Sequence, residues 1–452
     1  THLARLSSSS GYNWLKKAIK DSCASLPRGQ ALENVLGKLK DHIKTIVKPL
    51  NIFDEMDINY WGPFDGHNAS ELEYVFELAK RYDRPVLIHV VTVKGRGYEE
   101  AEKNPTAFHG VSPRSASTGP APAGKTWSEA ASDAVLEMAE KDDRIVCLTA
   151  AMKCGSKLDE FASRFPDRFF DVGISESHMV TMAAGMAAGG LRPVVFIYST
   201  FLQRAMDQLV HDVCMQNLPV IFAVDRAGLV GEDGETHQGL FDIAWSRPVP
   251  NLCVTAPRDE GTLRELFETG LQSGSPMMIR FPRGRVPESV KTSGPLSGGT
   301  PGNCLSPEVV AAGEDWVLFG YGRTVDLMLR AREHARESAF LPLPTVVDLK
   351  CLKPLPVGEL REMLTTHSFA IVAEDGYAEG GAGEAIAAFA ESIRGEAPAD
   401  VAVLGIPDIF VPQGKVCEQD EYCGLTPGNV VKIYAEHQKR AHRQAAPLEG
   451  AR

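Results

Sequence analysis

The chain has 452 residues, of which 44% are hydrophobic and 23% charged, and its net charge is −12 at pH 7. This composition is ordinary for a globular protein, and the length is enough for about three domains. The acidic balance argues against a general affinity for nucleic acid or for an anionic membrane surface. The longest apolar runs are far too short to cross a bilayer, so no membrane span is expected. Nine scattered cysteines without a CxxC pair favour reduced thiols and a cytoplasmic location.

The first block of the chain covers residues 1–120. Its pattern predicts two helices and a strand, over residues 32–48, 71–80 and 85–93. Asn68 and Ser70 are the candidate residues for the start of the second helix. Residues 112–125 are rich in Ser, Pro, Ala and Gly, a composition that is typical of an interdomain linker.

Two further blocks, residues 124–291 and 304–445, alternate apolar strands with helices, and a Gly-, Ser- and Pro-rich linker at 292–303 separates them. The strands expected in the second block are 145–149, 169–174, 193–198, 220–224, 253–256 and 277–281, with helices at 177–188, 202–216 and 260–271. In the third block the strands are 316–319, 345–347, 369–372 and 401–404, with helices at 325–337 and 383–393. Near-continuous apolar strands separated by helices predict the α/β class, in three-layer domains whose parallel sheets are covered on both faces.

Polar and aromatic side chains follow three strand ends of the second block. They lie in the segments 171–178, 198–204 and 225–239. Because the carboxyl ends of parallel strands share one edge of a sheet, where α/β proteins bind ligands, these side chains are expected to converge. Taken singly, each has a plain structural explanation: Glu176 could complement a helix dipole, and Phe201 could cap a buried helix start.

This ordered series resembles the pyrimidine-binding domain of the transketolase-type thiamine-diphosphate enzymes, and most closely that of the 1-deoxy-D-xylulose-5-phosphate synthases. The resemblance covers nearly the whole chain, and further matching motifs lie at residues 62–67, 94–98, 104–109, 281–284, 405–408 and 411–414. It implies a truncated diphosphate-binding domain over 1–120, a pyrimidine-binding domain over 124–291 and a transketolase C-terminal domain over 304–445.

The resemblance assigns residues to the cofactor, thiamine diphosphate. Glu176 corresponds to the catalytic acid that hydrogen-bonds the aminopyrimidine ring and supports its activation. Phe201 would stack on that ring, and Ile174 and Tyr98 would also contact the cofactor. His109 would reach the cofactor from the first domain, although a lone histidine in such a place is more often structural.

A second set of residues would handle the substrates. The resemblance implies that four side chains line the substrate pocket: Tyr198, Arg204, Arg226 and Arg283. Two of these, Arg226 and Arg283, would clamp a phosphate, for which the planar guanidinium fork is well suited. Asp233 and His237 would bind substrate hydroxyls or move protons.

The implied reaction condenses pyruvate, with decarboxylation, and glyceraldehyde 3-phosphate to 1-deoxy-D-xylulose 5-phosphate. This is the first step of non-mevalonate isoprenoid synthesis, and the product also serves thiamine biosynthesis. A homodimer is implied. The family binds Mg²⁺ and the diphosphate through a Gly-Asp-Gly motif and a later Asn, and the 452 residues contain no such arrangement. The magnesium ligands are therefore expected to be missing, no metal site is assigned, and the chain alone is expected to be inactive. The alternatives are an ordinary transketolase and a non-catalytic or complementing subunit of a split enzyme.

Overall fold

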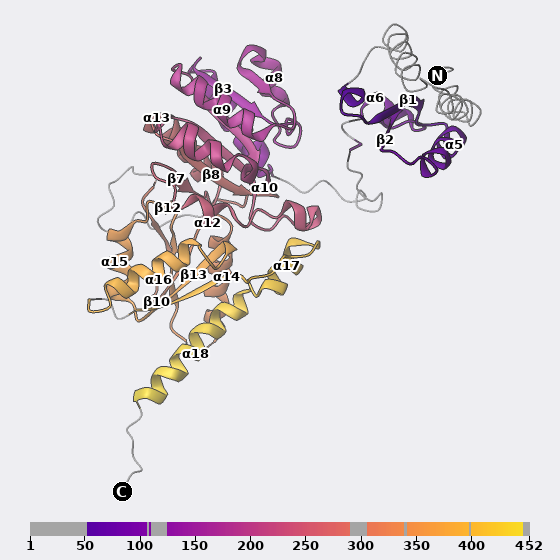
Figure 1. Cartoon of the computed structure of the whole chain (residues 1–452). Coiled ribbons are helices and arrows are strands. Elements are labelled where there is room, and N and C mark those ends of the chain that lie inside the picture. The colour runs from indigo at the N-terminus through magenta and orange to yellow at the C-terminus, as the bar shows by residue number, and fades with distance from the viewer. Residues whose placement is uncertain are drawn as a thin grey trace, which may run out of the picture. The chain divides into compact units, whose positions relative to one another are not determined.

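A computed structural model describes residues 52–105, 108–109, 124–289, 305–338, 341–396 and 399–445. The chain divides into two compact units, Thr1–Ala121 and Pro122–Arg452 (Figure 1). The helix expected at residues 32–48 lies outside the described residues. So do the linker at 292–303 and all but the last two residues of the linker at 112–125.

The first unit is built on a two-stranded parallel sheet. Its elements in chain order are α4 (Ile52–Glu55), β1 (Asn59–Asp65), α5 (Ala69–Lys80), β2 (Val86–Val91) and α6 (Glu99–Lys103). Of the two candidate starts for the helix before β2, Asn68 is the cap, because its side chain accepts a hydrogen bond of 3.1 Å from the Glu71 amide. Strand β2 agrees with the predicted strand to within two residues at either end.

This first unit has a small apolar core. Among its described residues, the buried apolar side chains are Phe64, Val75 and Ala101. Val91 and Val93, at and just beyond the end of β2, are each about half exposed. The described part of the first unit therefore packs few of its apolar side chains against one another.

The second unit contains a seven-stranded sheet in the order β12-β7-β8-β6-β5-β3-β4. Its strands are β3 (Ile145–Thr149), β4 (Phe169–Asp171), β5 (Arg192–Tyr198), β6 (Ile221–Ala227), β7 (Cys253–Thr255), β8 (Met277–Pro282) and β12 (Cys351–Lys353). Six of them are parallel, as predicted. The seventh, β12, comes from the third block and pairs antiparallel with β7. No strand was predicted at residues 351–353, so this link between the two blocks was missed.

The regular helices of this sheet are α7 (Trp127–Ala139), α8 (Asp159–Arg164), α9 (Glu176–Ala188), α12 (Asp242–Ser246) and α13 (Glu260–Ser273). Of these, α9 and α13 agree with predicted helices, whereas no helix was predicted at α7, α8 or α12. The segment expected to be a helix over 202–216 is helical but irregular, and consists of α10 (Ser199–Leu202), a 3₁₀ turn, α11 (Met206–Gln208) and a π-helical turn at Leu209–Cys214. Such irregular turns are frequent at functional sites.

A second, five-stranded sheet of the same unit has the order β14-β13-β10-β11-β9, in which only β9 is antiparallel. Its strands are β9 (Glu308–Ala311), β10 (Glu314–Gly320), β11 (Pro344–Asp348), β13 (Phe369–Tyr377) and β14 (Asp400–Ile406). Its helices are α14 (Thr324–Arg336), α15 (Val357–Thr366), α16 (Ala382–Ser392), α17 (Val416–Cys423) and α18 (Pro427–Ala445).

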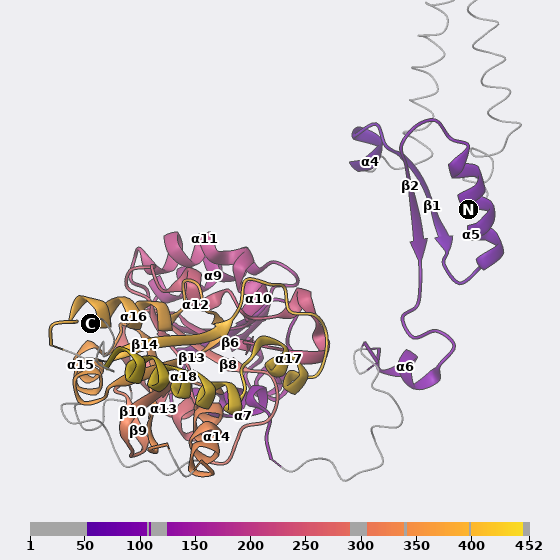
Figure 2. The same ribbon diagram turned by 90° about the horizontal axis from the view of Figure 1, so that it is seen from below.

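Both sheets bury both faces, which is why their strands read as continuous apolar runs. Along β5, Val194 and Phe196 join the core under α7 and α13, whereas Val195 and Ile197 join a core that also contains side chains of the second sheet. The far face of the second sheet packs on α14 and α18 (Figure 2), where the rings of Trp316 and Tyr434 stack 4.0 Å apart. The two sheets therefore share one packed interior.

No helix within the described ranges combines the length and the apolar character needed to span a membrane.

Candidate active site

Glu176 lies at a sharp turn between a strand and a helix. β4 ends at Asp171, whose carboxylate accepts hydrogen bonds from the amides of Ala151 (2.8 Å) and Gly173 (3.0 Å). Gly173 has φ +71°, a conformation that favours glycine, and α9 begins three residues later. The Glu176 side chain is buried, and its Oε1 accepts a hydrogen bond of 2.6 Å from Arg204.

The next strand, β5, delivers two aromatic rings to the same edge. Tyr198 ends the strand and Phe201 follows in α10, with their rings stacked at 5.8 Å. The ring of His237 meets Phe201 edge-on at 5.4 Å, and the Arg204 guanidinium lies 4.7 Å from the Phe201 ring centroid. Phe201 is therefore the centre of a cluster that joins the Glu176 turn to the loop after β6.

Two arginines meet around Asp233. Arg226, at the end of β6, places Nε 3.9 Å from one Asp233 oxygen, and Arg283, just after β8, places Nη1 3.5 Å from the other. The Arg226 guanidinium also lies 3.8 Å from the centroid of the Tyr198 ring. Arg226 has φ +58°, rare for a residue with a side chain, which indicates that the surrounding fold enforces its position.

Asp225 orients Arg226, and sequence analysis did not identify it as a site residue. It is fully buried and accepts hydrogen bonds from the Ser128 hydroxyl (2.7 Å) and from Arg226 Nη1 (2.9 Å). Burial raises the pKa of the Asp225 carboxyl, an effect that the Arg226 charge opposes. Its position directly before Arg226 could have identified Asp225 from the sequence. Nothing in the sequence indicates its contact with Ser128, which lies 97 positions away.

The Tyr198 hydroxyl lies against Gly155. A Cβ atom at Gly155 would lie 1.8 Å from the hydroxyl oxygen, so only glycine allows this approach. Burial raises the pKa of Tyr198 to about 12, and the phenol is therefore protonated at neutral pH. Gly155 is a second site residue that sequence reasoning missed.

His237 is oriented by its neighbours. Its Nδ1 lies 2.9 Å from the Thr236 hydroxyl, and the Thr236 carbonyl accepts a hydrogen bond of 3.1 Å from Thr200.

Ile174, expected to contact the cofactor, is 78% exposed in the turn before α9. The structure thus brings seven of the predicted residues into one neighbourhood: Glu176, Tyr198, Phe201, Arg204, Arg226, Asp233 and His237, with Arg283 joined through Asp233.

The remaining two predicted residues belong to the first unit. His109 Nδ1 lies 2.9 Å from Lys94 Nζ, and the Tyr98 ring meets Phe108 edge-on at 5.4 Å. Because an ammonium group only donates, Nδ1 of His109 must accept, which leaves the proton of the neutral ring on Nε2.

The described residues contain no group of three or more His, Cys, Asp or Glu side chains arranged to hold a metal ion.

Comparisons with known proteins identify the family of the domains. Three family models match in order: "1-deoxy-D-xylulose-5-phosphate synthase" over residues 1–92, "Transketolase, pyrimidine binding domain" over 123–289 and "Transketolase, C-terminal domain" over 307–430. A solved structure described as "Split gene transketolase, inactive beta4 tetramer" is 28% identical with a TM-score of 0.60, and the match covers 70% of this chain and 98% of that chain. The fold and the site thus define a protein of the transketolase type.

Curated relatives narrow the class. The 1-deoxy-D-xylulose-5-phosphate synthase of Carboxydothermus hydrogenoformans is 42% identical over 94% of this chain and 67% of its own length. That of Caldanaerobacter subterraneus subsp. tengcongensis is 42% identical over 97% of this chain and 70% of its own length. The chain belongs to the 1-deoxy-D-xylulose-5-phosphate synthase family of transketolase-type transferases, and it spans about two thirds of the length of these relatives.

Proposed function

We propose that this chain supplies the pyrimidine-binding and acceptor-binding part of an enzyme that condenses pyruvate, with loss of CO₂, and glyceraldehyde 3-phosphate to 1-deoxy-D-xylulose 5-phosphate. The observation that carries the proposal is the pair of guanidinium groups on Arg226 and Arg283, which both pair with Asp233. Two convergent guanidinium forks suit the phosphate of the acceptor. The family membership supports the choice of substrates.

Thiamine diphosphate is the cofactor that the pyrimidine-binding domain and the synthase relatives imply. The residues present fit its pyrimidine end. Glu176 is a buried carboxylate whose Oε2 has no hydrogen-bond partner among the described residues, and Phe201 supplies an aromatic surface beside it. When bound, the cofactor supplies a thiazolium carbon that attacks the 2-oxo acid and accepts its electrons on decarboxylation.

The chain's own residues have separate tasks in this proposal. Glu176 holds a proton at the pyrimidine ring nitrogen, and its bond to Arg204 orients the carboxylate. Arg226 and Arg283 bind the acceptor phosphate. His237, whose Nδ1 is engaged by Thr236, presents Nε2 to move a proton at the acceptor carbonyl, while Asp233 sets the spacing of the two arginines.

A finer part of the proposal is that the 452 residues alone do not turn over. The chain spans about two thirds of the synthase relatives, and the split-gene transketolase chain that it covers almost fully is described as inactive. That same similarity favours a second candidate function, in which the chain is one subunit of a split enzyme and works with a separate partner chain.

One assay separates these possibilities. Pyruvate and glyceraldehyde 3-phosphate, with thiamine diphosphate and Mg²⁺, are given to this chain alone and to this chain mixed with the N-terminal third of a synthase relative. Formation of 1-deoxy-D-xylulose 5-phosphate only in the mixture is the expected result. Turnover by the chain alone would contradict the inactivity, and transfer of a two-carbon ketol unit without pyruvate would favour a transketolase.

We also propose a homodimer and a cytoplasmic location. Two apolar side chains next to site loops, Ile174 and Phe410, are 78% and 75% exposed, and such exposed groups fit a protein interface. All seven cysteines in the described part of the chain are free thiols, which fits a reducing compartment. Sedimentation equilibrium would test the dimer, and a monomer at micromolar concentration would contradict it.

A further inference from the structure

The loop between β6 and α12 carries both Asp233 and His237, and the third block of the chain holds its backbone. The amide of Gly231 donates a hydrogen bond of 3.0 Å to Gln419 Oε1, and Gln419 Nε2 donates one of 3.3 Å back to the Gly231 carbonyl. The same Nε2 donates to the Pro412 carbonyl at 2.8 Å. Gln419 lies on α17 and is 2% exposed, so one buried side chain binds both polar groups of a single residue in the site loop.

A second glutamine makes the reverse connection. Gln238, within the loop, accepts a hydrogen bond of 2.9 Å from the Val230 amide and donates one of 3.3 Å to the Val411 carbonyl. Gly231 has φ +73°, and a Cβ atom there would lie 3.1 Å from Val416. The loop is therefore seated closely on the segment that precedes α17.

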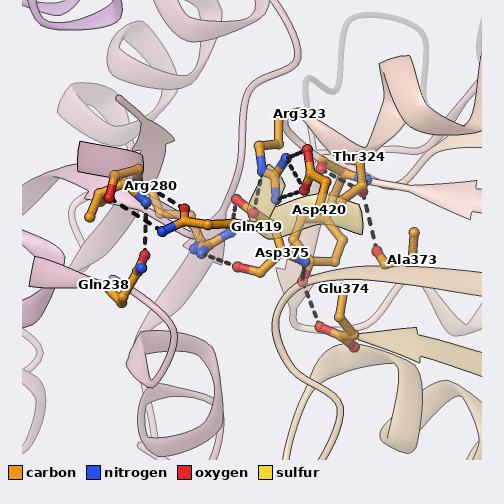
Figure 3. Close-up of polar contacts among 12 residues, drawn as sticks. Gln238, Arg280, Arg323, Thr324, Ala373, Glu374, Asp375, Gln419 and Asp420 are labelled. Atoms are coloured by element: carbon orange, nitrogen blue, oxygen red, sulfur yellow. Dashed lines mark hydrogen bonds and ion pairs between the residues drawn. The ribbon is translucent and has the colours of Figure 1, made fainter. Parts of the chain in front are cut away.

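Partly buried ion pairs hold α17 in place (Figure 3). Asp420, next to Gln419 in the chain, pairs with Arg323 at 3.0 Å, and Arg323 also binds Asp375 at 2.5 Å. Asp375 in turn lies 3.5 Å from Arg280, a fully buried arginine of β8. The strand that carries Arg280 leads directly to Arg283.

These contacts connect the two arginine-bearing segments in two ways. Ion pairs link β8 through Asp375 and Arg323 to α17, and the Gln419 side chain links α17 to Gly231. The ion pair of Asp233 with Arg283 returns to the segment just after β8. Asp233 is two residues beyond Gly231 and sets the spacing of the two guanidinium groups. A shift of Gly231 would consequently move Asp233 and change that spacing.

We infer that Gln419 is a positioning residue for the acceptor-phosphate site, so that the C-terminal domain determines how well phosphate is bound. The inference rests on the proposed function, because it takes Arg226 and Arg283 to be the phosphate ligands. A plainer role is that Gln419 only satisfies buried backbone groups between two domains. That role predicts a change in stability but no coupling to Arg283.

The test compares Gln419→Met with a matched control, Gln438→Met. Methionine keeps the side-chain length and removes the hydrogen bonds, and Gln438 makes two bonds of its own on α18 that do not involve the loop. Hydrogen exchange of the Gly231 amide is expected to quicken by about ten-fold or more in Gln419→Met, because a buried hydrogen bond is lost there. It is expected to stay at the wild-type rate in Gln438→Met.

A double-mutant cycle then measures the coupling, with glycerol 3-phosphate as the probe and its dissociation constant as the readout. Gln419→Met is expected to weaken binding by roughly three-fold or more when Arg283 is present and to change it little in the Arg283→Ala background. Equal weakening in both backgrounds, or an unchanged Gly231 exchange rate in Gln419→Met, overturns the inference.

Two further measurements distinguish failure of this inference from misfolding of the variant and from failure of the proposed phosphate site. If Gln419→Met does not fold, Asp420→Asn loosens α17 at a partly exposed position and is expected to shift both readouts in the same direction by a smaller factor; no shift in either readout counts against the inference. If Arg283→Ala alone leaves the dissociation constant unchanged, the proposed phosphate site is wrong. The Gly231 exchange rate still decides whether Gln419 holds the loop.

Discussion

The two units of the chain differ in how much of their structure holds the site residues in place. In the second unit the site loops follow strands that are buried on both faces, and ion pairs such as Arg280–Asp242 (3.0 Å) lie fully buried behind them. In the described part of the first unit the buried apolar side chains are Phe64, Val75 and Ala101, and His109 is held by its contact with Lys94. The side chains that we propose for the acceptor and the pyrimidine ring are thus held by a packed core, whereas His109 and Tyr98 belong to a lightly packed unit.

The largest loss of stability in the second unit is expected from a single added methyl group at Gly228. Its φ is +77°, and an added Cβ atom would lie 2.2 Å from the Asp375 carboxylate, which pairs with the buried Arg280 and the partly buried Arg323. We expect Gly228→Ala to lower the free energy of unfolding of the second unit by at least about 4 kcal/mol, as measured by denaturant titration.

The matched control is Gly274→Ala, which shares a φ of +71° but has nothing within 4 Å of the added Cβ. Only the conformational strain remains there, about 1–2 kcal/mol. Equal losses in the two variants would show that the contact with Asp375 is not what requires glycine at Gly228.

A second prediction compares the same substitution in both units. Val195 is fully buried in β5, whereas Val75 is buried in α5 of the first unit. We expect Val195→Ala to lower the free energy of unfolding of the second unit by about 2–3 kcal/mol, because it opens a cavity in a packed core. Val75→Ala should leave that transition unchanged. Calorimetry reports both, and a shift of the main transition in Val75→Ala would mean that the units do not unfold independently.

A third prediction concerns pH. Burial raises the pKa of Glu374 to about 6, although hydrogen bonds from Tyr321 and the Gly383 amide oppose the rise. A carboxyl with a raised folded-state pKa contributes stability below its unfolded pKa, near 4.5, and loses it as the pH rises through 6. The free energy of unfolding of Glu374→Gln minus that of the wild type should therefore be about 1–2 kcal/mol more positive at pH 7 than at pH 4.5.

The measurement is the difference in unfolding free energy between the wild type and Glu374→Gln at several pH values. Taking the difference removes the contributions of all groups that the two proteins share. A difference that stays constant from pH 4.5 to pH 7 would contradict the raised pKa.

The smallest expected effect on stability belongs to Glu176→Ala. The buried Glu176 carboxylate, at the start of α9, pairs with Arg204, whose side chain is 54% exposed. The guanidinium therefore stays solvated when the carboxylate is removed, and the free energy of unfolding should change by no more than about 1 kcal/mol. Proton exchange at the thiazolium carbon of thiamine diphosphate, in the mixture that turns over, should fall strongly. A variant that exchanges at the normal rate would remove Glu176 from its proposed role.

The sequence predicted the parallel strands and the convergence of Glu176, Phe201 and Arg226 well, because buried strands and the residues at their ends are local signals. It did not predict β12 or the ion pairs that join Arg280, Asp375 and Arg323. Their partners come from distant parts of the chain, and isolated charged residues read as solvated. Gln419 was missed for the same reason: its partner Gly231 lies 188 positions away.

Binding of glycerol 3-phosphate by this chain tests the central claim, that the acceptor-phosphate site is already formed in the second unit. The wild type is compared with Arg283→Ala and with Arg264→Ala, a surface arginine paired with Glu137 on the helical face of the sheet. We expect Arg283→Ala to raise the dissociation constant by about ten-fold or more, because charge-assisted hydrogen bonds to phosphate are lost, and Arg264→Ala to leave it unchanged. Equal dissociation constants in all three proteins would contradict the account.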